Sequence, residues 1–260
     1  MQLQLKDKVI LITGGAKGIG AAISRAVADE GGIPVVIDRD EEAGKKINHE
    51  LRGAGVNSTW VAAELSAADD CRRAVATAAE QLGQIDGLVN NAGVNDRVGL
   101  EHGNPDEYRA SLKRNLLHYY DMAHFCLPYL KKSQGPIVNI GSKTAVTGQG
   151  GTSGYASAKG AVLALTREWA VELLPYGIRV NAIVPAEVMT PLYRQWLSTF
   201  PDPEEKLKTI TSKIPLGHRM TQPEEIASMA VFLLSAKAGH ITGQHIFVDG
   251  GYTHLDRALI

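Results

Sequence analysis

The chain has 260 residues and a nearly even charge balance, with 27 lysine and arginine residues against 28 aspartate and glutamate residues. A chain of this length buries enough surface to fold without disulfides or a structural metal, and α/β folds of this size usually form one domain. We therefore expect one domain over residues 1–260. The balanced charge, without basic clusters, argues against nucleic acid or a membrane surface as a partner.

The predicted location of the protein is the cytoplasm. Cys71 and Cys126 lie far apart and form neither a disulfide framework nor a metal-binding pattern, which favours reduced thiols. The longest apolar run, residues 229–234, is much shorter than the roughly 18 residues that a membrane span requires. The first eight residues contain no apolar core of the kind found in a secretion signal.

Short runs rich in valine and isoleucine recur along the chain and are apolar on both faces. They lie at 8–13, 33–38, 57–62, 86–90, 136–141, 178–184 and 245–249. Segments with helical periodicity separate them, at 18–31, 40–53, 67–83, 105–131, 153–175 and 223–235. Because runs that are apolar on both faces are typical of a parallel sheet covered by helices, the sequence predicts an α/β fold. We expect a Rossmann-type doubly wound parallel sheet of about seven strands, with helices on both faces.

A long interval between two predicted strands, residues 185–222, is punctuated by prolines among short helical pieces. Proline breaks regular structure because it lacks an N–H group and fixes its own φ angle. Long loops inside compact domains commonly cover active sites. We therefore expect a substrate lid or binding loop at about 186–215 rather than a second domain.

The first predicted strand ends in a glycine-rich turn that opens the first helix. Gly14, Gly15, Gly18 and Gly20 occupy this turn. Glycines there let the backbone approach a pyrophosphate, which the free N–H groups and positive end of the helix stabilise. The spacing differs from the usual Gly-x-Gly-x-x-Gly pattern, so the prediction of a dinucleotide site depends on the placement between strand and helix.

Asp38 stands at the end of the second predicted strand, where a carboxylate can accept hydrogen bonds from an adenosine ribose. Such a carboxylate repels a 2′-phosphate and favours NAD as cofactor. Lys17 and Arg39 argue in the opposite direction, because either cation could reach a 2′-phosphate. The sequence therefore predicts NAD and leaves NADP as the alternative.

Tyr155 and Lys159 are four residues apart on a predicted helix and so project from one face of it. A phenol near a lysine ammonium loses its proton more readily and can then accept the proton of an alcohol during hydride transfer. Ser142, at the end of the preceding strand, can stabilise charge on the substrate oxygen. Asn115 lies inside the predicted helix 105–131, and by residue type alone it is equally compatible with a solvent-facing position.

The order and spacing of these motifs resemble the short-chain dehydrogenase/reductase family over nearly the whole chain. The resemblance rests on Thr13-Gly14-x3-Gly18-x-Gly20, Asn90-Asn91-Ala92-Gly93, Asn115, Ser142, Tyr155-x3-Lys159, Asn181, Pro185, Thr190 and Asp249-Gly250-Gly251. It implies that Tyr155 is the general acid/base, Lys159 its pKa tuner and a ligand of the nicotinamide ribose, and Ser142 the group that positions the substrate oxygen. It implies that Asn115 anchors a water-linked proton relay.

The same resemblance implies further cofactor contacts and a homotetramer. The contacts are Gly14, Lys17, Gly18, Ile19, Gly20, Asp38, Arg39, Glu64, Leu65, Asn91, Ala92, Gly93, Tyr155, Lys159, Pro185, Val188 and Thr190. Two residues depart from the family pattern. Glu64 stands where aspartate is frequent, and Ala186 follows Pro185 where glycine is common.

Substrate specificity is expected in three loops, 94–103, 143–152 and 186–215, which are rich in polar side chains. The candidate substrate residues are Asn95, Lys143, Gln149, Glu187 and Trp196. Polar groups that converge on a site suit the hydroxyls of a sugar, whereas a steroid pocket would be more apolar. Residues 219–227 and 251–259 also resemble the branch of the family that oxidises the anomeric hydroxyl of L-fucose. The predicted substrate is therefore L-fucose or a related pyranose.

Other functions remain open at this point. A hydroxysteroid or a 3-oxoacyl thioester as substrate would use the same catalytic residues, and a non-catalytic dinucleotide sensor could share the fold. The histidine pairs His118/His124 and His240/His245 do not have the spacing of ligands on one helix face, so we expect no catalytic metal. The glycines of 148–154, just before Tyr155, predict a loop with unusual freedom or close backbone contact with substrate.

Overall fold

A computed structural model describes residues 2–255. Its core is one sheet with the strand order β3-β2-β1-β4-β5-β6-β7, and every neighbouring pair is parallel. The strands are β1 (Val9–Thr13), β2 (Ile33–Asp38), β3 (Thr59–Ala62), β4 (Gly87–Asn90), β5 (Ile137–Ile140), β6 (Val180–Pro185) and β7 (His245–Val248). The predicted α/β class and the doubly wound parallel sheet are confirmed.

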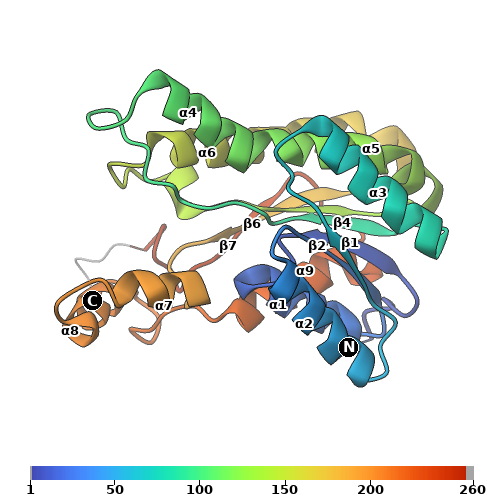
Figure 1. The fold of residues 1–260 in the computed structure, drawn as a ribbon, viewed down its shortest axis with the longest axis horizontal. Coiled ribbons are helices and arrows are strands. Elements are labelled where there is room, and N and C mark those ends of the chain that lie inside the picture. The colour runs from blue at the N-terminus through green and yellow to red at the C-terminus, as the bar shows by residue number, and fades with distance from the viewer. Residues whose placement is uncertain (1, 256–260) are drawn as a thin grey trace.

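Helices cover both faces of the sheet (Figure 1). One face carries α1 (Gly18–Asp29), α2 (Glu41–Gly53) and α9 (Pro223–Leu234), and the other carries α3 (Ala68–Leu82), α4 (Pro105–Leu112), α5 (His118–Ser133) and α6 (Ser153–Glu172). The segment predicted as a helix, 105–131, is helical throughout, but a π-helical turn at Lys113–Leu117 divides it into α4 and α5. Such turns insert an extra residue into the hydrogen-bond ladder and are frequent at functional sites.

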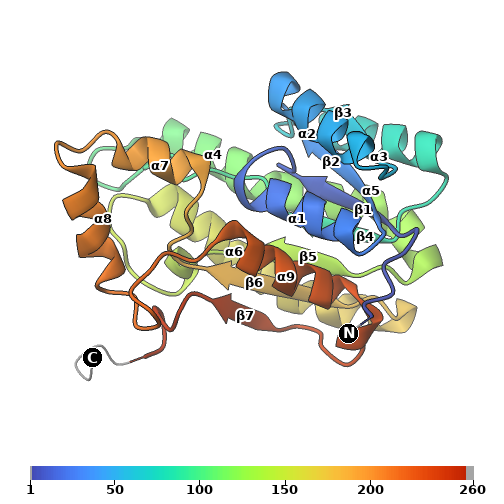
Figure 2. The same cartoon turned by 90° about the horizontal axis from the view of Figure 1, so that it is seen from below.

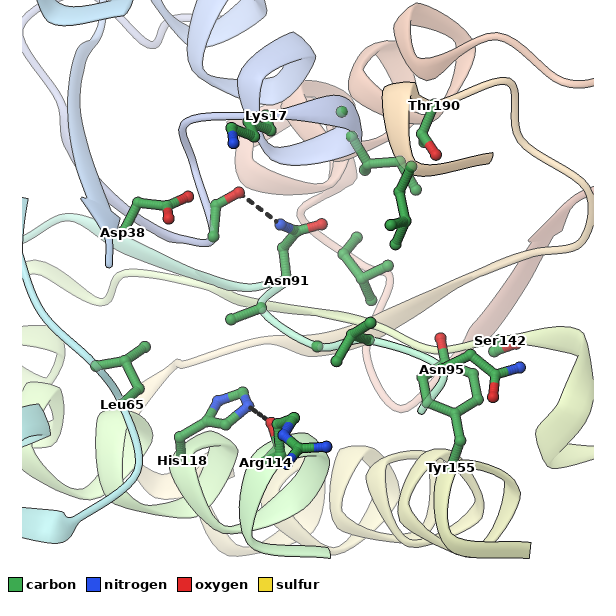
Figure 3. A pocket seen from close by; sticks show the side chains of 18 of the residues that line it. Lys17, Asp38, Leu65, Asn91, Asn95, Arg114, His118, Ser142, Tyr155 and Thr190 are labelled. Atoms are coloured by element: carbon green, nitrogen blue, oxygen red, sulfur yellow. Dashed lines mark hydrogen bonds between the residues drawn. The ribbon is translucent and has the colours of Figure 1, made fainter. Parts of the chain in front are cut away.

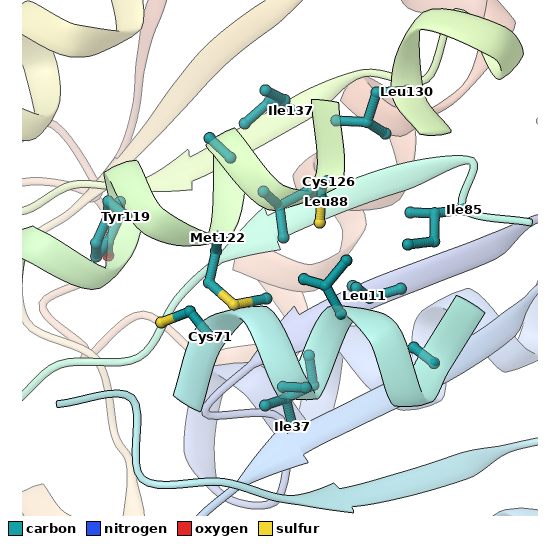
Figure 4. Packing of buried hydrophobic residues seen from close by; sticks show 14 of the residues in the cluster. Leu11, Ile37, Cys71, Ile85, Leu88, Tyr119, Met122, Cys126, Leu130 and Ile137 are labelled. Carbon is teal, nitrogen blue, oxygen red and sulfur yellow. The ribbon is translucent and has the colours of Figure 1, made fainter. Parts of the chain in front are cut away.

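The strands are apolar on both faces because each face packs against helices. Toward α3 and α5, Leu11, Ile37 and Leu88 pack with Met122 and Cys126 in one buried cluster (Figure 4). The alternate residues of the same strands point to the other face and pack with α1 and α9. Strands that bury both of their faces therefore read as continuous apolar runs in the sequence.

Both cysteines are free thiols inside this core. Cys71 and Cys126 are completely buried and form no disulfide. Burial raises the pKa of the Cys71 thiol to about 12 and also raises that of Cys126. Since the thiolate is the reactive form of cysteine, both side chains act as small apolar residues of the core.

The order of the strands reverses between β1 and β4. From β1 the chain proceeds through β2 to β3 on one side, and from β4 it proceeds through β5 and β6 to β7 on the other. In open α/β sheets a crevice forms at this point, outside the carboxyl ends of the strands, because the crossover helices leave to opposite faces. The loops that follow β1, β4 and β5 meet there.

Residues 186–215 contain two short helices, α7 (Pro191–Leu197) and α8 (Pro203–Thr211). Each begins at a proline, with Thr190 and Asp202 as the respective N-caps, because proline suits the first helical position. Both helices lie at one end of the molecule, far from α2 and α3 (Figure 2). Among the described residues, no helix combines the length and the apolar character needed to cross a membrane.

Candidate active site

A cavity of about 540 Å³ opens at the carboxyl ends of the central strands (Figure 3). Most residues predicted to bind cofactor line it. They are Gly14, Lys17, Gly18, Ile19, Asp38, Arg39, Glu64, Leu65, Asn91, Ala92, Gly93, Tyr155, Lys159, Pro185, Val188 and Thr190, and Ser142 and Asn95 line it too. The residues predicted for the site that do not line it are Gly20, Asn115, Lys143, Gln149, Glu187 and Trp196.

The turn after β1 requires glycine at two positions. Gly14 has a φ of 61°, and a Cβ there would lie 3.0 Å from the Cα of Ala92. A Cβ on Gly20 would lie only 2.0 Å from the carbonyl oxygen of Gly14. Gly20 therefore does not line the cavity, and its lack of a side chain allows α1 to pack closely against the turn. The amide of Asn91 closes the turn by donating to the carbonyl oxygens of Thr13, at 2.9 Å, and Gly14, at 3.1 Å.

Helix α1 begins with its first N–H groups unused by side chains. Lys17 at the N-cap makes no capping hydrogen bond, and the first turn contains no acidic residue. Helix α2, in contrast, begins with a capping bond from Asp40 and two glutamates. Free N–H groups and the positive end of a helix bind anions. A turn with no space for side chains in front of such a helix fits the pyrophosphate of a dinucleotide.

Three carboxylates and two cations surround the far end of this turn. Asp38 accepts hydrogen bonds from the backbone N–H groups of Ala16, at 3.1 Å, and Asp40, at 3.0 Å. Asp40 also forms an ion pair with Lys17, whose pKa rises through this hydrogen bond. Lys17, which the sequence set against Asp38 in the choice of cofactor, is thus paired with Asp40 and not with Asp38.

The second cation at this edge is also paired. Arg39 donates to Glu64 across 3.0 Å, and the hydrogen bond raises the pKa of the guanidinium. Glu64, the residue that departs from the family pattern, is long enough to reach Arg39 at the protein surface. With each cation held by its own carboxylate, Asp38 leaves this edge with an excess of negative charge.

Ser142 and Tyr155 meet at the opposite end of the cavity (Figure 3). The Ser142 oxygen accepts hydrogen bonds from the N–H, at 3.2 Å, and the hydroxyl, at 3.0 Å, of Thr144, so its own hydrogen remains free to be donated. Burial raises the pKa of Tyr155 to about 12, and a hydrogen bond with Ser142 opposes this rise. The phenol therefore stays protonated until positive charge lies near it.

Lys159 is the positively charged side chain next to Tyr155. Its side chain is buried, and Nζ donates to the hydroxyl of Tyr119 and to the carbonyl oxygen of Ile140, each at 2.7 Å. Nζ lies 5.6 Å from the centre of the Tyr155 ring, within the range of a cation–π contact. Burial lowers the pKa of Lys159 to about 7, which makes its charge sensitive to these acceptors.

Asn115 is buried in the π-helical turn, which excludes the solvent-facing alternative. Its Oδ1 accepts a hydrogen bond of 2.7 Å from the backbone N–H of Val94. The Cβ of any residue larger than glycine at position 93 would approach this oxygen to 3.1 Å. Asn115 therefore fixes the loop after β4, which forms one wall of the cavity. Asn115 itself does not line the cavity.

The predicted substrate residues fall into four groups. Asn95 lines the cavity, whereas Gln149 lies exposed on the glycine-rich loop. Lys143 and Glu187 form a mostly buried ion pair, and Tyr193 donates to Glu187 across 2.8 Å. They directly follow Ser142 and Ala186 in the chain, both of which line the cavity. Trp196 packs against the guanidinium of Arg97, with 5.7 Å from the guanidinium carbon to the ring centre.

The glycine-rich loop before Tyr155 combines freedom with close packing. Gly150 and Gly151 have φ values of 81° and 64°, and a Cβ at either position would meet no atom within 4 Å. A Cβ at Gly154 would lie 2.4 Å from the Ser111 hydroxyl oxygen, so this glycine allows α4 and α6 to approach each other. Glycine is therefore favoured at positions 150 and 151 by their positive φ angles, and at position 154 by the lack of space for a side chain.

Sequence reasoning missed several neighbours of the site, of which Tyr119 and His118 are buried. Tyr119 and His118 lie one helical turn after Asn115, and Arg114 pairs with Asp96 across 2.7 Å. Their positions follow from the phase of α5 after the π-helical turn, and no local motif marks them. In residues 2–255 no group of three histidine, cysteine, aspartate or glutamate side chains is arranged to hold a metal ion.

Comparison with known proteins agrees with this geometry. A family model described as enoyl-(acyl carrier protein) reductase matches residues 14–253. The L-fucose dehydrogenase of Oryctolagus cuniculus is 38% identical over 245 residues, covering 94% of this chain and 84% of the relative. The 3-oxoacyl-[acyl-carrier-protein] reductase FabG of Thermotoga maritima is 34% identical, over 96% of this chain and 99% of the relative.

A solved structure shares the whole arrangement. The crystal structure of Cj0485 dehydrogenase superposes with a TM-score of 0.94 at 50% sequence identity, covering 99% of this chain and 98% of that chain. The family model, these relatives and the nicotinamide-dinucleotide cavity with Ser142, Tyr155 and Lys159 lead to one assignment. The chain belongs to the short-chain dehydrogenase/reductase family and is an NAD(P)-dependent dehydrogenase.

Proposed function

We propose that the protein oxidises the anomeric hydroxyl of a cyclic sugar to a lactone, with L-fucose as the preferred substrate and NAD as the hydride acceptor. The observation that carries the reaction is the meeting of Ser142 and Tyr155 above buried Lys159 at one end of the cavity. The similarity to L-fucose dehydrogenases supports the choice of sugar.

The roles of the catalytic residues follow from their hydrogen bonds. Ser142, whose oxygen already accepts two bonds from Thr144, donates its hydrogen to the substrate oxygen. Tyr155 takes the hydroxyl proton, and the charge of Lys159 stabilises the phenolate. A nicotinamide dinucleotide bound in the cavity would supply the acceptor for the hydride that leaves the anomeric carbon. Asn115 keeps the loop after β4 in place beside these groups.

The preference for NAD rests on the carboxylates at the far end of the turn. Asp38 faces the position of the adenosine ribose, and Lys17 and Arg39 are each paired with another carboxylate. A 2′-phosphate there would meet a carboxylate before it met a free cation. These contacts favour NAD over NADP.

The choice of a sugar rests on the polar character of the substrate side. The ion pair of Lys143 and Glu187, with the hydroxyl of Tyr193, lies directly beside residues that line the cavity. Lys143, Glu187 and Tyr193 are already paired with one another, and such polar surroundings suit a substrate that carries hydroxyls better than an apolar one.

A panel of substrates tests this proposal. We expect NADH formation with L-fucose, L-galactose or D-arabinose, and its near-complete loss in Tyr155→Phe while the variant still binds NADH.

The second candidate function, reduction of a 3-oxoacyl thioester, is favoured by the similarity to the Thermotoga maritima enzyme. Turnover of acetoacetyl thioester with NADPH, together with inactivity toward every aldose, would establish that function instead.

We also propose a homotetramer located in the cytoplasm. Large apolar side chains are exposed on neighbouring helices, among them Leu117 and Tyr120 near the start of α5 and Val171 in α6. Exposed apolar side chains gathered on one part of a surface are typical of subunit interfaces. The two buried free thiols fit a reducing compartment.

A further inference from the structure

His118 carries a buried nitrogen that lacks a partner at the wall of the cofactor cavity. The side chain is 2% exposed and lines the cavity together with Leu65, Ala92 and Arg114. Its Nε2 lies 3.0 Å from the carbonyl oxygen of Arg114. Because a carbonyl oxygen only accepts hydrogen bonds, Nε2 carries the proton. The other nitrogen, Nδ1, is buried and has no hydrogen-bond partner in the described part of the chain.

The surroundings keep this nitrogen an acceptor. Burial, together with the nearby charge of Lys159, lowers the pKa of His118 to about 4. The imidazole is therefore neutral near pH 7, with its single proton on Nε2. A buried polar atom without a partner is unfavourable, and such atoms are rare in folded proteins. The missing partner must be a hydrogen-bond donor that enters from the cavity.

The position of His118 indicates which part of a ligand this donor belongs to. In Figure 3 the unpaired nitrogen points into the space between Leu65 and Asn91, on the side where Asp38 lies and away from Tyr155. Since Tyr155 marks the reacting end, the nicotinamide belongs there and the adenosine half of the dinucleotide belongs near Asp38. That half carries donors of two kinds, the adenine amino group and the ribose hydroxyls.

We propose that His118 binds the cofactor, and that its Nδ1 accepts a hydrogen bond from an N–H or O–H group of the adenosine half of the dinucleotide. Asp38 and His118 would then contact adenosine at the same end of the cavity, each from a different wall. This role depends on dinucleotide binding and not on the identity of the sugar, so it can hold or fail independently of the function proposed above.

Two substitutions separate the two nitrogens of His118. The amide of His118→Gln can reach the Arg114 carbonyl but offers no acceptor at the place of Nδ1. The shorter His118→Asn places an amide oxygen near the place of Nδ1 and gives up the bond to Arg114. In titrations of NADH fluorescence without any sugar, we expect His118→Gln to raise the Kd about tenfold and His118→Asn to stay within about threefold. Equal weakening in both variants, or an unchanged Kd in His118→Gln, would overturn the proposal.

Cofactor analogues identify which group of adenosine donates the hydrogen bond to His118. The probes are NAD analogues that lack the adenine amino group, the adenosine 2′-hydroxyl or the adenosine 3′-hydroxyl. The analogue without the partner of His118 should bind wild type and His118→Gln equally well, whereas the other two should still bind His118→Gln about tenfold more weakly. If His118→Gln does not fold, the same comparison is made with His118→Leu, which also lacks an acceptor at the place of Nδ1. If every analogue loses the same affinity on substitution, His118 has no specific partner in adenosine.

Discussion

At the scale of single residues, the charge of Lys159 depends on a tyrosine outside the Tyr155-x3-Lys159 motif. Tyr119 is fully buried, donates to the carbonyl oxygen of Ile140 at 2.9 Å and accepts from Lys159 at 2.7 Å. The ammonium of Lys159, without a carboxylate beside it, is therefore stabilised by two neutral oxygens. Each such acceptor favours the charged form of a buried lysine, since burial by itself favours the neutral one.

Replacement of Tyr119 by phenylalanine tests this dependence. Loss of one acceptor should lower the pKa of Lys159 further below about 7, so that the lysine loses its charge at lower pH. We expect kcat to fall several-fold, and the fall to be larger at alkaline pH. The measurement is the pH profile of kcat with the best sugar. Tyr120→Phe, an exposed change on the same helix, serves as the control, and an alkaline limb that does not move would contradict the prediction.

His118 should make the fold sensitive to acid. Its pKa is about 4 in the folded protein and 6.5 ordinarily, so between these values the unfolded chain binds a proton that the folded chain does not. Stability contributed by the neutral imidazole is therefore lost as the pH falls from 6.5 to 4. In urea unfolding, wild type should lose about 2–3 kcal/mol more than His118→Gln between pH 7 and pH 4.5. His102→Gln, at an exposed site, should behave as wild type; equal losses in all three proteins would disprove the expectation.

The placement of the proposed catalytic residues at one cavity was predictable from the sequence where they lie in local motifs. Ser142, Tyr155 and Lys159 are carried by one strand end and one helix turn, so their spacing was informative. Tyr119 was not predictable, because its contact with Lys159 joins residues 40 positions apart. The same holds for the pairing of Lys143 with Glu187, which the sequence suggested as two separate substrate residues.

At the scale of elements, the boundaries of strands and helices were predictable to within a few residues, and the π-helical turn was not. The sequence between 105 and 131 has helical periodicity throughout, and a single inserted residue leaves each half of that pattern intact. The extra residue nevertheless changes the phase between α4 and α5. This change gives Asn115, His118 and Tyr119 their buried positions.

The turn between β1 and α1 should be the element least tolerant of a methyl group. Gly20→Ala places a Cβ 2.0 Å from the carbonyl oxygen of Gly14 and 2.6 Å from the amide nitrogen of Asn91, so the turn must open. We expect NADH affinity to fall by at least tenfold and the free energy of unfolding by a few kcal/mol. Fluorescence titration and chemical denaturation measure the two effects.

Gly53→Ala provides the matched control. Gly53 ends helix α2, and a Cβ there meets no atom within 4 Å. The substitution should leave NADH affinity unchanged and alter stability by less than about 1 kcal/mol. If Gly20→Ala also behaves in this way, the close approach of α1 to the turn is not required for cofactor binding.

At the scale of the whole molecule, the exposed apolar residues of α5 and α6 form neighbouring surfaces. The rings of Tyr120 and Trp169 lie 6.5 Å apart between the two helices, and Val171 and Leu174 are 69% and 59% exposed nearby in the chain. A protein that remained monomeric would expose these side chains to water at an unfavourable free energy. The resemblance to a tetrameric family implied an assembly, but the sequence alone did not indicate which face takes part.

Light scattering after gel filtration tests the assembly. Wild type should elute with four times the mass of one chain, and Val171→Asp should shift the mass to a smaller species because a charge is buried without a partner. Asp29→Asn, a surface change on α1 at the other face of the sheet, should leave the mass unchanged. A monomeric wild type would rule out the proposed tetramer.

The paired cations beside Asp38 have a consequence for how cofactor preference could be changed. Lys17 is held by Asp40 and Arg39 by Glu64, so the proposed preference for NAD does not depend on a lack of positive side chains. It depends on a surplus of one carboxylate over the available cations at this edge. Neutralising Asp38 balances the local charge, and neutralising Glu64 as well releases a guanidinium beside the ribose. The residues needed to hold a 2′-phosphate are therefore already present in the chain, and two carboxylates keep them occupied.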